Sequence, residues 1–329
     1  MAAFKVVTAF SDNYEVGRLC SKVNRLYCER QGHAWHELVL SQEAMLAAVA
    51  PRTHCTWYKV HIFLDELERA LGGEEESPGP PHTGSGKAPL PPLDGSAAVG
   101  RPLKENDYLV WMDADAVFVD HTKRLQEIVE EAEHKELIIG EDMHLGNLVN
   151  CGVILIKVTP WSLGLWRQVY NCRKYDAVTY FEQSALHKVL KTNREFASSV
   201  EGREPSQSVP WHSFVSRGDL KESGTEDVKI FDHSAVFPMH LLNSNICDED
   251  LEAVADPTTG RRGQERPGGE ARRGQIRQHR KARHCRYSHQ KARFVYHAAG
   301  FSRKISVISK MVKSRLPDID ISEFGDLCG

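Results

Sequence analysis

The chain has 329 residues, of which 41% are hydrophobic and 26% are charged. This length suffices for one large domain or two ordinary ones, and the composition excludes a wholly disordered, collagen-like or coiled-coil protein. The net charge of −3 conceals two unequal parts. Residues 261–293 hold 12 Lys and Arg against 2 Glu, a local balance of +10 that leaves −13 on the remainder.

Hydrophobic patterns predict alternating strands and helices in the first part of the chain. A strand is predicted at Lys5–Phe10, and helical periodicity follows over Tyr14–Gln31. A short strand is predicted at His36–Leu40 and a helix at Thr56–Leu71. Tyr108–Met112 is a continuous apolar run, which is typical of a strand buried on both faces of its sheet.

The alternation continues in the second part of the chain. Further strands are predicted at four places, namely Leu137–Gly140, Gly152–Lys157, Val228–Phe231 and Phe294–Tyr296. Thr159 followed by Pro160 marks the start of a helix through Trp161–Tyr170. Thr179 and Glu182 fit a capping box that opens another helix, through about Leu190. This order of elements predicts a doubly wound α/β sheet, in which ligands bind at the carboxyl ends of strands.

Two stretches contain few large apolar residues and are expected to be disordered insertions, at residues 72–102 and about 256–291. No run approaches 18 consecutive apolar residues, and the first ten residues are too short and too strand-like for a signal peptide. The eight cysteines include no C-x-x-C pair, and we expect a mostly reduced interior.

Two carboxylates follow the predicted strand at Tyr108–Met112. Asp113 and Asp115 are one residue apart, so both can converge on one hard cation where the chain turns. A metal ion at such a site neutralises charge on a leaving diphosphate. The same pattern also fits a phosphatase of haloacid-dehalogenase type, with Asp113 as the nucleophile and Asp115 as the acid/base. A third interpretation is a solvated turn, and the local sequence does not separate the three.

Three later segments carry polar residues at similar places. Asn150 precedes the predicted strand at Gly152–Lys157, and Glu182 and Gln183 lie at a helix start. His297 follows the last predicted strand. A glycine and two cations come after it, namely Gly300, Arg303 and Lys304.

Taken in this order, the motifs resemble those of nucleotide-sugar glycosyltransferases of the GT-A fold. The segments WMDADAVFVD, NCGVILIK and FEQSAL are most similar to glycosyltransferase family 34, a group of galactosyl-, mannosyl- and xylosyltransferases. The resemblance covers most of the chain outside the two insertions. It implies a single catalytic domain over residues 1–329, with a GT-A-like, doubly wound mixed sheet and helices on both of its faces.

The resemblance also implies roles for individual residues. Asp113, Asp115 and His297 would hold Mn²⁺ or Mg²⁺, and imidazole beside carboxylates favours Mn²⁺. The residues implied to bind the nucleotide-diphosphate sugar are Thr8, Ala9, Asp12, Lys59, Asp113, Gly300, Arg303 and Lys304. Those implied to face the donor sugar and the acceptor in catalysis are Asn150, Glu182 and Gln183.

Four of these residues have a structural alternative. Glu182 would complete the capping box with Thr179, and Lys59 would be a surface lysine on an amphipathic helix. His297 would be a hydrogen-bonded histidine at a strand end, and Asn150 would only form a turn.

The implied activity is transfer of a hexose or pentose from a nucleotide-diphosphate sugar to a glycan or glycosylated acceptor, with retention of configuration. Members of the family are typically Golgi membrane proteins, but this sequence shows no anchor. We therefore expect a soluble or truncated form, whose membrane association would need a partner or a missing anchor. No nucleic-acid partner is expected. The alternative to an enzyme is a non-catalytic nucleic-acid- or membrane-binding protein that acts through residues 261–293.

Overall fold

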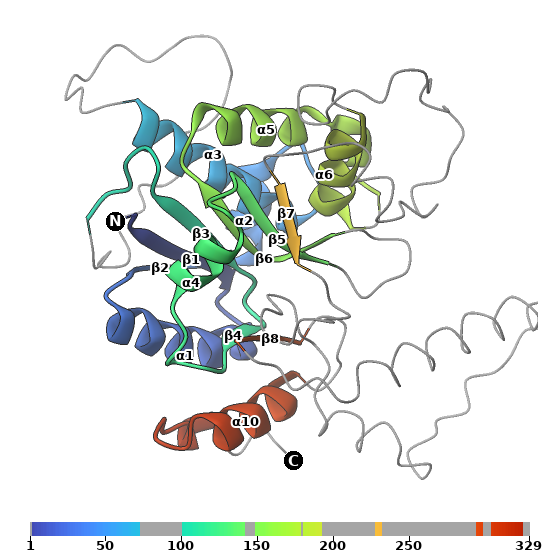
Figure 1. Cartoon of the computed structure of the whole chain (residues 1–329). Coiled ribbons are helices and arrows are strands. Elements are labelled where there is room, and N and C mark those ends of the chain that lie inside the picture. The colour runs from blue at the N-terminus through green and yellow to red at the C-terminus, as the bar shows by residue number, and fades with distance from the viewer. Residues whose placement is uncertain are drawn as a thin grey trace, which may run out of the picture.

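A six-stranded mixed β-sheet forms the centre of the fold (Figure 1). The computed structural model describes residues 2–72, 101–141, 149–178, 180–192, 228–231, 294–298 and 304–324. The strands, in spatial order, are β2 (Ala34–Leu40), β1 (Phe4–Ser11), β3 (Tyr108–Met112), β6 (Val149–Lys157), β5 (Leu137–Glu141) and β7 (Val228–Phe231). β6 runs antiparallel to both of its neighbours, whereas β1 is parallel to β2 and β3, and β5 is parallel to β7.

Helices cover both faces of this sheet because its central strands are apolar on both sides (Figure 1). Leu109 and Trp111 of β3 belong to the core on one face, with residues of α2 (Gln42–Val49), α3 (Tyr58–Leu71), α5 (Pro160–Asn171) and α6 (Phe181–Thr192). Tyr108, Val110 and Met112 alternate with them and join the opposite core, with residues of α1 (Glu15–Gln31) and α4 (Leu125–Glu131). The result is a three-layered α/β fold.

A second, two-stranded sheet lies beside the main one. It pairs β4 (Ala116–Phe118) with β8 (Val295–His297) in antiparallel register, with Ala116 opposite His297. The C-terminal helix α10 (Lys304–Arg315) packs its apolar residues against α1 and this sheet in a third core cluster. The segment that carries His297 is thereby joined to the chain that follows β3.

Arg52 joins the loop before α3 to the connection between α5 and α6. Its guanidinium lies 3.7 Å from the ring centroid of Trp57 and 4.3 Å from that of Tyr170. It also donates hydrogen bonds to the Asp176 carboxylate and to the Tyr170 carbonyl. These contacts fix the start of α3 relative to the segment that leads into α6. Each of the two segments contains a short 3₁₀ helix, η1 (Cys55–Trp57) and η2 (Arg173–Tyr175).

The predicted fold class, a doubly wound mixed α/β sheet with helices on both faces, is confirmed. The predicted helix at Thr56–Leu71 begins with η1 and continues as α3, and the last strand is displaced by one residue, from Phe294–Tyr296 to Val295–His297. Thr159 caps α5, since its hydroxyl accepts a hydrogen bond from the Ser162 amide at 3.3 Å. Among the described residues, five elements were not predicted, namely α2, β4, α4, η2 and α10.

Several predictions fall on residues outside those that the structure describes. They include residues 73–100 of the first expected insertion, the whole of the second, and Thr179 of the expected capping box. Within the described ranges, no disulfide is formed by the five cysteines there, namely Cys20, Cys28, Cys55, Cys151 and Cys172. In the same ranges, no helix has the length and apolar character to cross a membrane.

Candidate functional site

The turn between β3 and β4 presents Asp113 and Asp115 at the carboxyl end of β3. The Asp113 amide donates to the Gly152 carbonyl of β6 at 2.7 Å, and the Ala116 amide donates back to the Asp113 carbonyl at 2.9 Å. The Ala298 amide donates to the Asp115 carbonyl at 2.9 Å. Backbone hydrogen bonds to both sheets therefore define the path of this turn.

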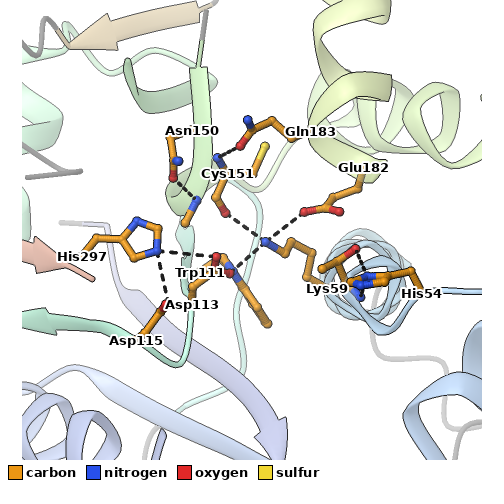
Figure 2. A network of polar contacts seen from close by, with 12 residues as sticks. His54, Lys59, Trp111, Asp113, Asp115, Asn150, Cys151, Glu182, Gln183 and His297 are labelled. Carbon is orange, nitrogen blue, oxygen red and sulfur yellow. Dashed lines mark hydrogen bonds and ion pairs between the residues drawn. The ribbon is translucent and has the colours of Figure 1, made fainter. Parts of the chain in front are cut away.

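Asp113, Asp115 and His297 form a group that could hold a metal ion, since one ligand atom from each lies within 4.8 Å of the others. His297 Nε2 lies 3.2 Å from Asp115 Oδ1 and 3.9 Å from Asp113 Oδ2 (Figure 2). The side chains of His297 and Asp115 are only 3% and 10% exposed, whereas that of Asp113 is 29% exposed. The group is therefore open to solvent on the Asp113 side.

The charged forms of His297 and Asp115 stabilise each other. Burial would lower the pKa of His297, but the carboxylates of Asp115 and Asp113 together outweigh burial and raise it above its usual value. Burial would likewise raise the pKa of Asp115, but His297 and Lys304 outweigh burial and hold it well below its usual range. Two carboxylates and an imidazole are a donor set that suits Mn²⁺, so the residues present fit the implied metal ion.

Gly152 of β6 provides the space in which the His297 ring lies. A Cβ atom at this position would be 2.1 Å from His297 Cε1 and 2.5 Å from His297 Nδ1. These distances are far inside van der Waals contact, so only glycine is compatible with the observed position of His297.

Lys59 of α3 is buried at the centre of a polar network beside Asp113 (Figure 2). Its ammonium lies 2.8 Å from Asp113 Oδ1, 3.1 Å from Glu182 Oε1 and 3.2 Å from the Cys151 carbonyl. Burial would lower the pKa of Lys59, but Asp113 and Glu182 outweigh burial and raise it. Lys59 is thus a buried cation between two carboxylates, which excludes the alternative of a surface lysine.

Glu182 lies at the start of α6 and is also buried. Its Oε1 pairs with Lys59, while its Oε2 has no hydrogen-bond partner among the described residues. A buried carboxylate oxygen in this condition can accept a hydrogen bond from a hydroxyl group of a bound substrate.

Asn150 and Gln183 stabilise an irregular stretch of β6. The pairing of β5 with β6 shifts register at this stretch, between Ile139 and Gly140. The Gln183 carboxamide oxygen accepts from the Cys151 amide at 2.9 Å, and that of Asn150 accepts from the Gly152 amide at 2.8 Å (Figure 2). Both residues therefore lie in the polar network, and each carboxamide oxygen is engaged by the backbone of β6.

Lys304, the first residue of α10, reaches the opposite side of the acidic pair. Its ammonium lies 2.6 Å from Asp115 Oδ2 and 3.2 Å from the Tyr14 hydroxyl. Burial would lower the pKa of Lys304, but the Asp115 carboxylate outweighs burial and raises it. Burial and the same carboxylate raise the pKa of Tyr14 to about 12.

The remaining predicted site residues are those at the end of β1 and those that follow His297. Thr8 and Ala9 lie in β1 near its carboxyl end, beside β3, and Asp12 follows that strand. Thr8 is buried with a hydroxyl that has no partner among the described residues, and Asp12 is exposed. Gly300 and Arg303 lie outside the residues that the structure describes.

Sequence reasoning missed two residues of the polar network around the acidic pair. Trp111 Nε1 donates a hydrogen bond to Asp113 Oδ1 at 2.7 Å, and Tyr14 contacts Lys304. A signal for Trp111 existed, because side chains two residues apart in a strand lie on the same face. No comparable signal connected Tyr14 with a lysine 290 residues later.

Compared by sequence, the chain matches no protein-family model and has no significant match among curated proteins. Compared by structure, it is similar to a glycosyltransferase involved in the glycosylation of the major capsid of PBCV-1, with a TM-score of 0.46 and 11% identity over 94% of this chain and 98% of that chain. It is also similar to the glycosyltransferase GlyE of Streptococcus pneumoniae TIGR4 in two crystal structures. One has a TM-score of 0.33 and 15% identity, and its apo-form has 0.32 and 16%; each match covers 58% of this chain and 44% of that one.

Proposed function

We propose that this chain is a metal-dependent glycosyltransferase that moves a hexose or pentose from a nucleotide-diphosphate sugar to a glycan or glycosylated acceptor. The observation that carries the proposal is the convergence of Asp113, Asp115 and His297 at the carboxyl end of β3. Ligands of open α/β sheets bind at this edge. The order of the sequence motifs, and their similarity to glycosyltransferase family 34, supply the reaction class.

Asp113, Asp115 and His297 would hold the divalent cation, Mn²⁺ or Mg²⁺, and the cation would neutralise charge on the departing diphosphate. Lys59 and Lys304 flank the two aspartates and would add positive charge beside the diphosphate. These lysines would thus stabilise the leaving group from the protein side.

Glu182, Gln183 and Asn150 would face the reacting sugar. The unpartnered Oε2 of Glu182 would accept a hydrogen bond from a hydroxyl of the donor or acceptor. Asn150 and Gln183 would fix the adjacent backbone of β6 through their carboxamide oxygens. The acceptor hydroxyl would attack the anomeric carbon from the face on which the bond to the diphosphate oxygen breaks, and its proton would pass to the departing diphosphate. Attack on that face gives retention of configuration without a covalent intermediate.

The remaining parts of the proposal concern the organisation of the chain. The nucleoside would bind at the end of β1, beside Thr8, Ala9 and Asp12, and Gly300 and Arg303 would approach the diphosphate. Residues 1–329 would form one catalytic domain in which residues 72–102 and about 256–291 are insertions.

The test is Mn²⁺-dependent hydrolysis and transfer with a panel of UDP- and GDP-sugars, using the wild type, Asp115→Asn and Glu130→Gln. Glu130 is an exposed carboxylate of α4 and serves as the matched control. Asp115→Asn removes a charged ligand, so its turnover should fall by more than the roughly 10–100-fold that changes around metal ligands typically cost. Glu130→Gln should resemble the wild type.

Two outcomes would contradict the proposal. One is the absence of binding and turnover for every sugar nucleotide, and the other is undiminished turnover by Asp115→Asn. Formation of an aspartyl-phosphate on Asp113 without sugar-nucleotide turnover would favour the phosphatase instead.

A further inference from the structure

The two aspartates of the metal group share a pattern of contacts. Asp113 Oδ1 accepts hydrogen bonds from Lys59 at 2.8 Å and from Trp111 at 2.7 Å, while Asp115 Oδ2 accepts from Lys304 at 2.6 Å. The other oxygen of each carboxylate is the one nearer His297 Nε2. Each aspartate thus turns one oxygen to a lysine and the other toward the histidine.

Both lysines are themselves held in place by other elements. Lys59 is additionally bonded to the Cys151 carbonyl and paired with Glu182, and its side chain is only 6% exposed. Lys304 is additionally bonded to the Tyr14 hydroxyl. The oxygens that face the lysines are therefore anchored to α3 on one side and to α10 and the start of α1 on the other.

Anchoring one oxygen has a consequence for the other. The terminal torsion of an aspartate is soft, so a free carboxylate rotates or binds a cation through both oxygens. A carboxylate held at one oxygen offers the second in a defined direction, and it loses less conformational freedom when a ligand binds.

A lysine beside a metal ligand also has an opposing effect, because its charge repels the cation. At this site the positive charge of each ammonium is offset by the carboxylate with which it pairs, and that of Lys59 is offset by Glu182 as well. Hydrogen-bonding partners of metal ligands commonly strengthen metal binding by orienting those ligands.

We propose that Lys59 and Lys304 are positioning residues for Asp113 and Asp115, respectively. Each lysine fixes the carboxylate oxygen that faces it and thereby directs the other oxygen, which lies nearer His297, at the metal position. This inference rests on the metal site of the proposed function and gives the two lysines a task that precedes any contact with the diphosphate.

The test measures Mn²⁺ affinity without sugar nucleotide, from the electron paramagnetic resonance signal of unbound Mn²⁺. Lys304→Met removes the anchor of Asp115 and should weaken Mn²⁺ binding about 10–100-fold. Lys304→Arg keeps a charged donor and should retain most of the affinity. Lys310→Met removes a positive charge from an exposed position of α10 and should leave the affinity unchanged.

A second variant keeps the test decisive if Lys304→Met fails to fold, as judged by its circular dichroism melt. Tyr14→Phe leaves Lys304 in place but removes its hydroxyl partner, and it should weaken Mn²⁺ binding relative to the wild type. Unchanged affinity in this variant would count against the proposed anchoring.

The outcomes separate the inference from the function on which it rests. Mn²⁺ binding by a folded Lys304→Met that equals or exceeds that of the wild type overturns the positioning role, and tighter binding identifies Lys304 as a competitor of the cation. Failure of the wild type to bind Mn²⁺ overturns the metal site and the inference together.

Discussion

Gly152 lies where any side chain would collide with His297. A Cβ atom on residue 152 would lie only 2.1 Å from His297 Cε1. Alanine at this position is therefore incompatible with the observed position of the His297 ring. His297 is buried and its ring faces both aspartates, so the collision cannot be relieved without moving a proposed metal ligand. A residue with no Cβ atom thus decides where the proposed ligand His297 lies.

Gly152→Ala should therefore displace His297 from the acidic pair. We expect Mn²⁺ affinity to fall at least tenfold and the free energy of unfolding to fall by about 1–3 kcal/mol, as is common when a packed site is overfilled. The measurements are Mn²⁺ titration and urea unfolding.

Gly164→Ala is the matched control, because a Cβ at this position of α5 meets no atom within 4 Å apart from the neighbouring backbone of its own helix. It should leave Mn²⁺ binding intact and raise the free energy of unfolding by about 0.5–1 kcal/mol, since alanine favours a helix over glycine. Equal behaviour of the two variants would refute the steric explanation.

At the residue scale, the sequence predicted which side chains to examine but not which partners they have. Asp113, Asp115 and His297 were grouped by motif order, and the structure brings them together. The ion pair of Lys304 with Asp115 was not predicted, because the resemblance placed Lys304 only beside the diphosphate and implied no partner for it within the chain. Local patterns contain no information about such a contact.

At the scale of elements, polar caps and side chains determine where regular structure begins and where it is interrupted. The hydroxyl of Thr159 accepts from the Ser162 amide at the start of α5 and also donates to the Glu136 carboxylate. Asn150 and Gln183 satisfy amides of β6 next to the place where its pairing with β5 shifts register. The second arrangement lies in the site, whereas the first lies at the other end of β6.

Thr159→Ala should destabilise the fold without altering the site. Loss of the cap should lower the free energy of unfolding by about 0.5–2 kcal/mol. Thr159→Ser keeps the hydroxyl and should remain close to the wild type. Urea unfolding measures both, and equal losses in the two variants would show that the hydroxyl contributes nothing.

The elements that the sequence predicted are those with a strong local signal. The apolar run of Tyr108–Met112 predicts a buried strand from five consecutive residues, and the Thr159–Pro160 pair predicts a helix start from two. β4 has only three residues, and it forms a strand because β8 lies beside it. α10 was likewise not predicted, and its apolar residues pack against those of α1.

At the scale of the whole molecule, buried histidines make the fold sensitive to acid. His33 packs against Phe4 and Tyr27, and burial lowers its pKa to about 4. Burial and the neighbouring Arg30 likewise lower the pKa of His121 to about 4. Both imidazoles remain neutral in the folded protein at pH values where an unfolded chain, with histidine pKa near 6.5, binds protons.

The free energy of unfolding should therefore decrease as the pH falls from about 6.5 to about 4, because the unfolded state binds more protons over this interval. Below about pH 4 these two residues should contribute no further decrease. Urea unfolding between pH 7 and pH 4 should show a smaller decrease for the double variant His33→Gln, His121→Gln. An unchanged pH dependence in that variant would assign the acid sensitivity to other groups.

The small sheet of β4 and β8 has a consequence for the order of assembly. Pairing of β4 with β8 places His297 opposite Ala116, next to the turn that carries Asp115. The Lys304–Asp115 pair likewise joins residues that are 189 positions apart. Closing so long a loop is entropically costly, so such contacts form only after more local structure exists. During synthesis, the strands β1, β2, β3, β5 and β6 emerge well before His297 does. The nascent chain can thus form much of its core while it still lacks His297, and the proposed metal group is complete only when the C-terminal part docks.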